Sequence, residues 1–129
     1  MLRSSLVRIV AVGATIAALV SCAPKPDPSL VGPTSAVPAG SAITITGHGW
    51  GTANSGCATT VSAKAFVSGI SPYGAIDLPR STVDSVGNFQ SAWQTPDVSE
   101  SMKWTIEVTQ ACNGSSTLVR SIVIELNIR

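Results

Sequence analysis

The chain has 129 residues, with eight basic residues, seven acidic residues and one histidine, so its formal net charge is +1 at pH 7. This near-neutral balance includes no cluster of lysine and arginine, which argues against a nucleic-acid partner. It also provides no polybasic patch for acidic lipid headgroups. The length is that of one ordinary domain with a short additional segment.

The first segment, residues 1–21, has the three parts of an export signal. Arg3 and Arg8 precede an apolar run over residues 9–20, and the small residue Ser21 follows that run. The run is about a dozen residues long, whereas a helix that spans a bilayer needs roughly 20. We therefore expect a helical signal peptide over residues 1–21 rather than a transmembrane anchor.

The end of this segment, Leu19-Val20-Ser21-Cys22, resembles the lipobox of bacterial lipoproteins. The resemblance implies cleavage before Cys22, a diacylglyceryl group on its sulfur, and further acylation, for example with palmitate, on its new amino group. An anchor of several acyl chains holds a protein at a membrane more firmly than one chain does. The expected location is the extracytoplasmic face of the cell membrane. An ordinary secretory signal, with Cys22 as the first residue of a soluble protein, is the alternative.

Residues 22–29 are predicted to form a short spacer after the cysteine. Pro24, Pro26 and Pro28 alternate with other residues there, and proline fixes φ and removes a backbone donor. Such a stretch favours an extended, semi-rigid conformation. From Cys22 onward the chain carries six basic and seven acidic residues, a net charge of −1.

Residues 30–129 show short runs in which apolar and polar residues alternate. In the clearest run, Trp104, Ile106 and Val108 alternate with polar residues, as a strand with one buried face requires. No helical periodicity is sustained in this region. The strong runs cover residues 43–46, 61–67, 89–94, 103–109 and 121–128, and weaker runs at 35–37 and 75–83 complete about seven strands.

Two of these stretches resemble bacterial Ig-like extracellular domains. The first is the run from Ile43 to Trp50, which ends in Gly-His-Gly-Trp, and the second runs from Val83 to Phe89 and contains Asp-x-x-Gly-x-Phe. The resemblance implies an all-β fold, an Ig-like antiparallel β-sandwich of about seven strands over residues 30–129. It also implies that residues 83–89 form a hairpin between the fourth and fifth strands.

Cys57 and Cys112 remain as a pair once Cys22 carries lipid. Neither belongs to a Cys-x-x-Cys motif, and the single histidine does not complete a zinc site, so we expect a disulfide in the oxidising compartment. In an Ig-like topology the two cysteines lie in loops at the same end of the sandwich. We therefore expect a Cα–Cα distance of about 4.4–6.8 Å.

The remaining candidate residues favour structural roles. His48 is interpreted as a turn residue rather than a ligand, and Asp77 and Asp84 as surface carboxylates, so no catalytic residue, no metal site and no cofactor is assigned. Trp50 and Tyr73 are the candidates for ligand binding, although we expect Trp50 to anchor its loop.

The leading functional hypothesis is a membrane-anchored Ig-like module that is not an enzyme and binds a protein or a cell-envelope component. The alternative is a lipoprotein that binds a carbohydrate or another small ligand through Trp50 and Tyr73. Because one fold serves many functions, the first hypothesis depends on analogy with other sandwich domains.

Overall fold

The structure is a computed structural model that describes residues 26–69, 74–114 and 116–128. It contains eight strands and one short 3-10 helix: β1 (Ser29–Val31), β2 (Val37–Pro38), β3 (Ala42–His48), η1 (Ala53–Ser55), β4 (Thr60–Val67), β5 (Ile76–Thr82), β6 (Phe89–Gln94), β7 (Met102–Ala111) and β8 (Thr117–Asn127). Within these residues, no helix has the length and apolar character needed to cross a bilayer. The predicted signal peptide lies outside the described residues.

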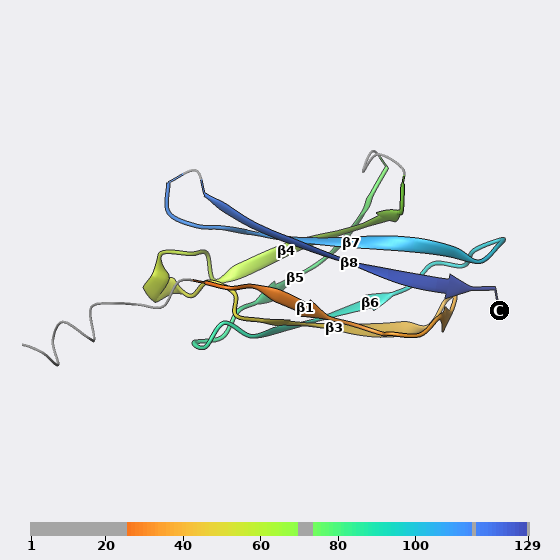
Figure 1. The fold of residues 1–129 in the computed structure, drawn as a ribbon, viewed down its shortest axis with the longest axis horizontal. Helices are drawn as coiled ribbons and strands as arrows, with labels where there is room; N and C mark the ends of the chain where they lie inside the picture. The colour runs from red at the N-terminus through yellow and green to blue at the C-terminus, as the bar shows by residue number, and fades with distance from the viewer. Residues whose placement is uncertain (1–25, 70–73, 115, 129) are drawn as a thin grey trace, which may run out of the picture.

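The strands form two sheets that pack face to face (Figure 1). One sheet has the order β1-β3-β6, and the other has the order β2-β8-β7-β4-β5. All neighbours are antiparallel except β2 and β8, which are parallel. This order matches an Ig-like sandwich in which β5 has joined the sheet of β4, β7 and β8. The predicted fold class is confirmed.

Three details differ from the sequence-based prediction. The first strand, β1, was not predicted, and the weak run at residues 35–37 becomes the two-residue strand β2. The chain changes sheets between Val31 and Val37, because β1 pairs with β3 and β2 pairs with β8. The predicted hairpin at residues 83–89 is wrong, because β5 pairs with β4 and β6 pairs with β3. The tight turn therefore joins strands of opposite sheets.

The core lies between the sheets, and the predicted alternation places its residues correctly. Ile45 and Ile106 are fully buried, one from each sheet. Trp93 of β6 and Trp104 of β7 pack across the interface with ring centroids 5.8 Å apart. The other buried apolar side chains that fill this layer include Ile43, Trp50, Val61, Ala63, Ala65, Leu78, Val83, Phe89, Val108, Ile124 and Leu126.

The described part of the predicted spacer lies against the domain. The Asp27 N–H donates a hydrogen bond to the Gly49 carbonyl oxygen at 3.0 Å. The Arg120 guanidinium donates from Nε to the Pro28 carbonyl oxygen, also at 3.0 Å. Proline does not block these contacts, because the bonded groups are a neighbouring N–H and the proline carbonyl. Any free spacer therefore ends before Asp27.

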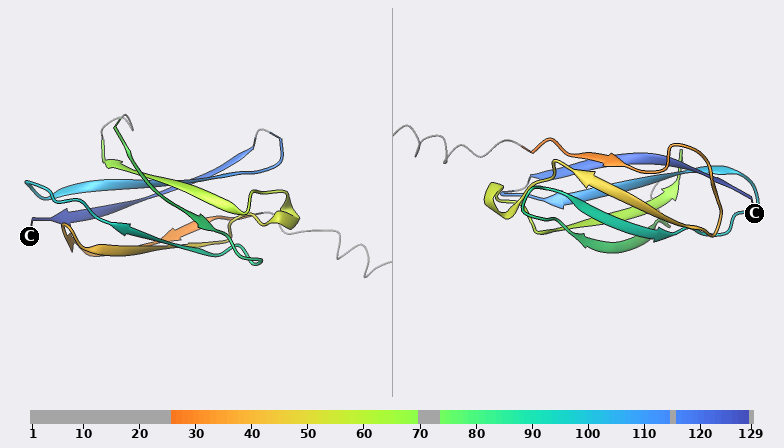
Figure 2. Two further views of the ribbon diagram at one scale, coloured as in Figure 1. Left: turned by 180° about the vertical axis from the view of Figure 1, so that it is seen from behind. Right: turned by 90° about the horizontal axis from the view of Figure 1, so that it is seen from below.

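The domain is elongated along its strands, and its two chain ends lie at opposite ends (Figures 1 and 2). Residues 26–28 lie beside the end that carries η1, which we call the N-terminal end. Asn127 and the chain terminus lie at the other end.

Candidate interaction surface

The outer surface of the five-stranded sheet is the wider of the two exposed sheet faces. Its side chains alternate along β4, β7 and β8 with those that enter the core. We call this surface the five-strand face, and it consists of Ser62, Lys64, Phe66, Lys103, Thr105, Glu107, Thr109, Val119, Ser121, Val123 and Glu125.

Charged residues of opposite sign are neighbours across the strands of this face. Lys64 lies opposite Asp77 on β5 and opposite Glu107 on β7. Lys103 lies opposite Glu125 on β8. Opposite charges at directly paired positions stabilise a sheet by about 0.2–1 kcal/mol per pair. The pairing therefore favours the observed register and leaves the face without a strong net charge.

Apolar side chains are exposed on the same face. Val119 is 42% exposed and Val123 is 57% exposed, and both project from β8. Val123 lies opposite Thr105, whose hydroxyl is 2.7 Å from the Ser68 hydroxyl. An apolar side chain within a polar surround offers a partner a hydrophobic contact, although single exposed apolar residues are common on protein surfaces.

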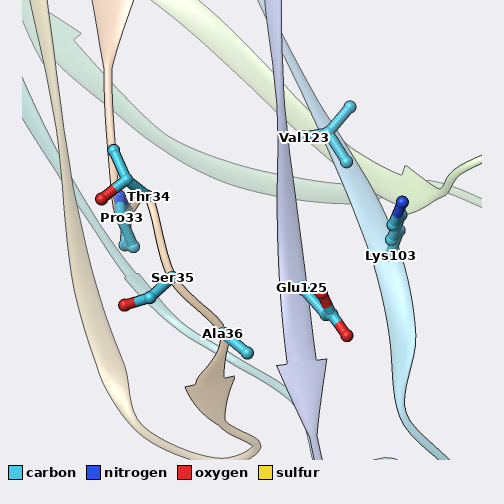
Figure 3. Close-up of a pocket in the computed structure, with 7 residues that line it drawn as sticks. All are labelled: Pro33, Thr34, Ser35, Ala36, Lys103, Val123 and Glu125. Carbon is cyan, nitrogen blue, oxygen red and sulfur yellow. The ribbon is translucent and has the colours of Figure 1, made fainter.

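A shallow groove continues this face at the edge of the sheet (Figure 3). The segment from Pro33 to Ala36, between β1 and β2, forms one wall, and Val123 and Glu125 of β8 form the other with Lys103 of β7. Its volume is about 230 Å³. The groove places an apolar group and both signs of charge within one small area.

The outer face of the three-stranded sheet is chemically different. Along β3 and β6 it presents small or polar side chains and no lysine, arginine or carboxylate, and we call these residues the three-strand face: Ala42, Thr44, Thr46, His48, Gln90, Ala92 and Gln94. The two sheet faces therefore offer a partner different chemistry.

The N-terminal end of the sandwich carries the disulfide. Cys57 and Cys112 are bonded and lie directly opposite each other in an antiparallel bridge. The predicted pairing is confirmed, and the two cysteines lie just before β4 and just after β7 as expected. Their Cα–Cα distance of 3.8 Å is shorter than the predicted range. Direct cross-strand pairing brings opposite Cα atoms to about 4.5–5.5 Å, so it accounts for a distance at the short end of the predicted range but not for one below it.

Gln110 is a structural residue that the sequence-based interpretation missed. It is 1% exposed, and its amide nitrogen donates to the carbonyl oxygens of Gly51 and Ala58 at 2.7 and 2.8 Å. Its amide oxygen accepts from the Gly51 N–H at 2.8 Å. Gln110 thus fixes the loop between β3 and β4. The available signal was its position in the alternation after Ile106 and Val108, where an apolar residue would be expected.

The side chain of Trp50 is buried. It is 2% exposed, its indole N–H donates to the Ser29 carbonyl oxygen at 3.0 Å, and its ring meets Phe89 edge-to-face at 5.5 Å. The expected role as a loop anchor fits this environment. The candidate role in ligand binding does not, because a buried ring offers no face on which a ligand could stack.

The turn between β5 and β6 is held by Asp84. Its Oδ1 accepts the N–H groups of Val86 and Asn88 at 3.0 and 2.9 Å. His48, the last residue of β3, lies with Nδ1 3.2 Å from the Asn88 side-chain oxygen. Gly87 adopts φ 87°, and a Cβ there would lie 2.4 Å from the Trp50 carbonyl oxygen. This polar cluster is therefore engaged in forming the turn.

Two predicted site residues, Cys22 and Tyr73, lie outside the described residues. In the part of the chain that is described, no group of three or more histidine, cysteine, aspartate or glutamate side chains is placed to hold a metal ion.

Known proteins resemble this chain in structure rather than in sequence. No protein-family model matches the chain, and no curated protein matches it. A solved structure of murine CRIg is similar over 80% of this chain and 98% of that chain, with 15% sequence identity and a TM-score of 0.44. The assignment of the fold therefore rests on the strand order described above.

Proposed function

We propose that this chain is a lipoprotein, anchored through Cys22 at the extracytoplasmic face of the membrane, whose Ig-like domain binds a protein or cell-envelope component without catalysis. The observation that carries the binding role is the five-strand face. It combines the exposed side chains of Val119 and Val123 with paired charges and a shallow groove. A protein interface has an apolar centre and a polar rim, and this face offers side chains of both kinds.

The position of the N-terminal end supports this arrangement. Four residues lie between Cys22 and Asp27, the first described residue that is hydrogen-bonded to the domain, and the five Cα–Cα steps span at most about 18 Å when extended. The anchor would therefore hold the disulfide end near the lipid. The five-strand face extends along the long axis and would remain accessible from the side.

The anchor is tested by Cys22→Ser. We expect the variant to leave the membrane fraction and to lose incorporation of an acyl label. Cys112→Ser is the control for loss of a cysteine that takes no lipid, and it should keep the label. Unchanged membrane partition of Cys22→Ser, with no label in the unmodified chain, would contradict the anchor.

The binding face is tested by photo-crosslinking in intact cells. A photoreactive residue at Val123 should give a discrete adduct, because this side chain is 57% exposed on the five-strand face. The matched control is Thr44, an exposed residue on the three-strand face. Equal adducts at both positions, or none at Val123, would contradict the assignment without affecting the anchor.

A further inference from the structure

The turn after β7 contains the only Asn-Gly pair of the chain, Asn113-Gly114. The Cys112 N–H donates a hydrogen bond to the Ser116 carbonyl oxygen at 3.0 Å, which closes a short loop around this pair. Asn113 is exposed, and the Gly114 N–H has no main-chain hydrogen-bond partner among the described residues. The Asn113 side chain and the Gly114 nitrogen are therefore both accessible.

The space around Gly114 allows the main chain to rotate there. Gly114 adopts φ 69°, and a Cβ built on it would have no neighbour within 4 Å. Glycine also lacks the side chain that would hinder an approach to its nitrogen, and its backbone adopts more conformations than that of any other residue. This freedom lets the Gly114 nitrogen approach Cγ of the preceding residue, Asn113, and close a cyclic imide.

The other three asparagines lack this combination. Asn54 lies in η1, where the following N–H, that of Ser55, donates a hydrogen bond at 3.0 Å within the same turn. Asn88 is followed by Phe89, which is buried, and its own side-chain oxygen lies 3.2 Å from an imidazole nitrogen. Asn127 precedes an isoleucine, whose branched Cβ crowds the nitrogen that would have to attack. Each of these three sites therefore opposes formation of an imide.

We propose that the Asn113-Gly114 turn is a site of spontaneous deamidation, at which Asn113 becomes aspartate or isoaspartate. The Gly114 nitrogen attacks Cγ of Asn113 and forms a new N–C bond. The bond between Cγ and Nδ2 breaks, and the NH2 group leaves as ammonia with the proton of the Gly114 N–H. Water then opens the cyclic imide: its hydroxyl group bonds to one of the two imide carbonyl carbons, and its other proton returns to the Gly114 nitrogen.

The two products change this end of the sandwich in different ways. Opening of the imide at Cγ gives aspartate, and opening at the main-chain carbonyl carbon gives isoaspartate, whose main chain is longer by one carbon. Either product adds a carboxylate, so the chain from Cys22 onward would carry six basic and eight acidic residues, a net charge of −2. The isoaspartate also lengthens the loop that the hydrogen bond between Cys112 and Ser116 closes. This reaction needs neither the lipid anchor nor the five-strand face.

The test uses the full mature chain with Cys22→Ser, folded and with its disulfide intact, incubated at neutral pH in water enriched in heavy oxygen. Samples taken over time are digested in ordinary water and mapped by mass spectrometry, so product formed during digestion is recognised by its lighter mass. We expect the peptide with Asn113 to exchange its NH2 group for a heavy hydroxyl group and to give two products that chromatography separates. The peptides with Asn54, Asn88 and Asn127 should react severalfold more slowly.

Gly114→Ala is the matched variant. It adds a methyl group that hinders the attack, at a position with no neighbour within 4 Å, and should slow deamidation of Asn113 severalfold. Because alanine is strained at positive φ, its folding is checked by circular dichroism. The comparison among the four asparagines of the parent chain decides the question even if this variant does not fold. Asn113 reacting no faster than the other three would overturn the proposal, and so would deamidation of folded Gly114→Ala at the parent's rate.

Discussion

Replacing Gln110 with leucine should lower the free energy of unfolding by more than a substitution at an exposed position does. The leucine fills similar volume but removes the partners of the Gly51 N–H, the Gly51 carbonyl and the Ala58 carbonyl. Gly51 is buried, whereas Ala58 is exposed and its carbonyl can bond to water. Two buried groups without partners cost about 1–3 kcal/mol each, partly offset by the apolar side chain. We expect a net loss of about 2–4 kcal/mol in the free energy of unfolding.

Urea denaturation with the disulfide intact measures this loss. The matched control is Gln90→Leu, which changes an exposed glutamine on β6 and should stay within about 0.5 kcal/mol. A loss for Gln110→Leu no larger than that of the control would refute the interpretation of Gln110 as the residue that fixes the loop.

Three further outcomes are expected. Ile106→Ala should cost about 2–5 kcal/mol in the same denaturation assay, because Ile106 is fully buried, whereas Thr105→Ala should cost about 1 kcal/mol or less; equal losses would contradict the assigned faces. Reducing Cys57–Cys112 should remove about 4 kcal/mol for a sequence separation of 55, lowering the melting temperature while the circular dichroism of the strands persists. Gly87→Ala should lower the melting temperature by several degrees, because its φ is positive and its Cβ would meet the Trp50 carbonyl; an unchanged temperature would mean that the turn adapts.

The fold was predictable from the sequence because one face of each long strand is buried. The alternation of Trp104, Ile106 and Val108 with polar residues assigns β7, and the same reasoning finds four other long strands. It could not find β1, because three residues are too few to show a period of two. The family resemblance misjudged the turn at Asp84, since a tight turn has the same local chemistry whether it joins paired strands or strands of opposite sheets.

The candidate surface was less predictable. The sequence marked Trp50 as a possible contact residue, but a tryptophan in a glycine-rich loop looks the same whether its ring is exposed or buried. The five-strand face instead depends on the register that brings Lys64 beside Glu107 and Val123 beside Thr105. Register joins residues distant in sequence, so alternation within one strand does not reveal it.

The contacts of residues 27–29 have a mechanical consequence. β1 runs antiparallel to β3 along the long axis. A pull on the chain before Asp27 would therefore shear β1 past β3, and the hydrogen bonds between these two strands would bear the force at the same time. The same pull reaches β8 through the bond from Arg120 to Pro28. Tension applied at a membrane anchor would thus be divided between both sheets before any strand detached. The domain would resist force best in the direction in which a tethered binding module is pulled by its partner.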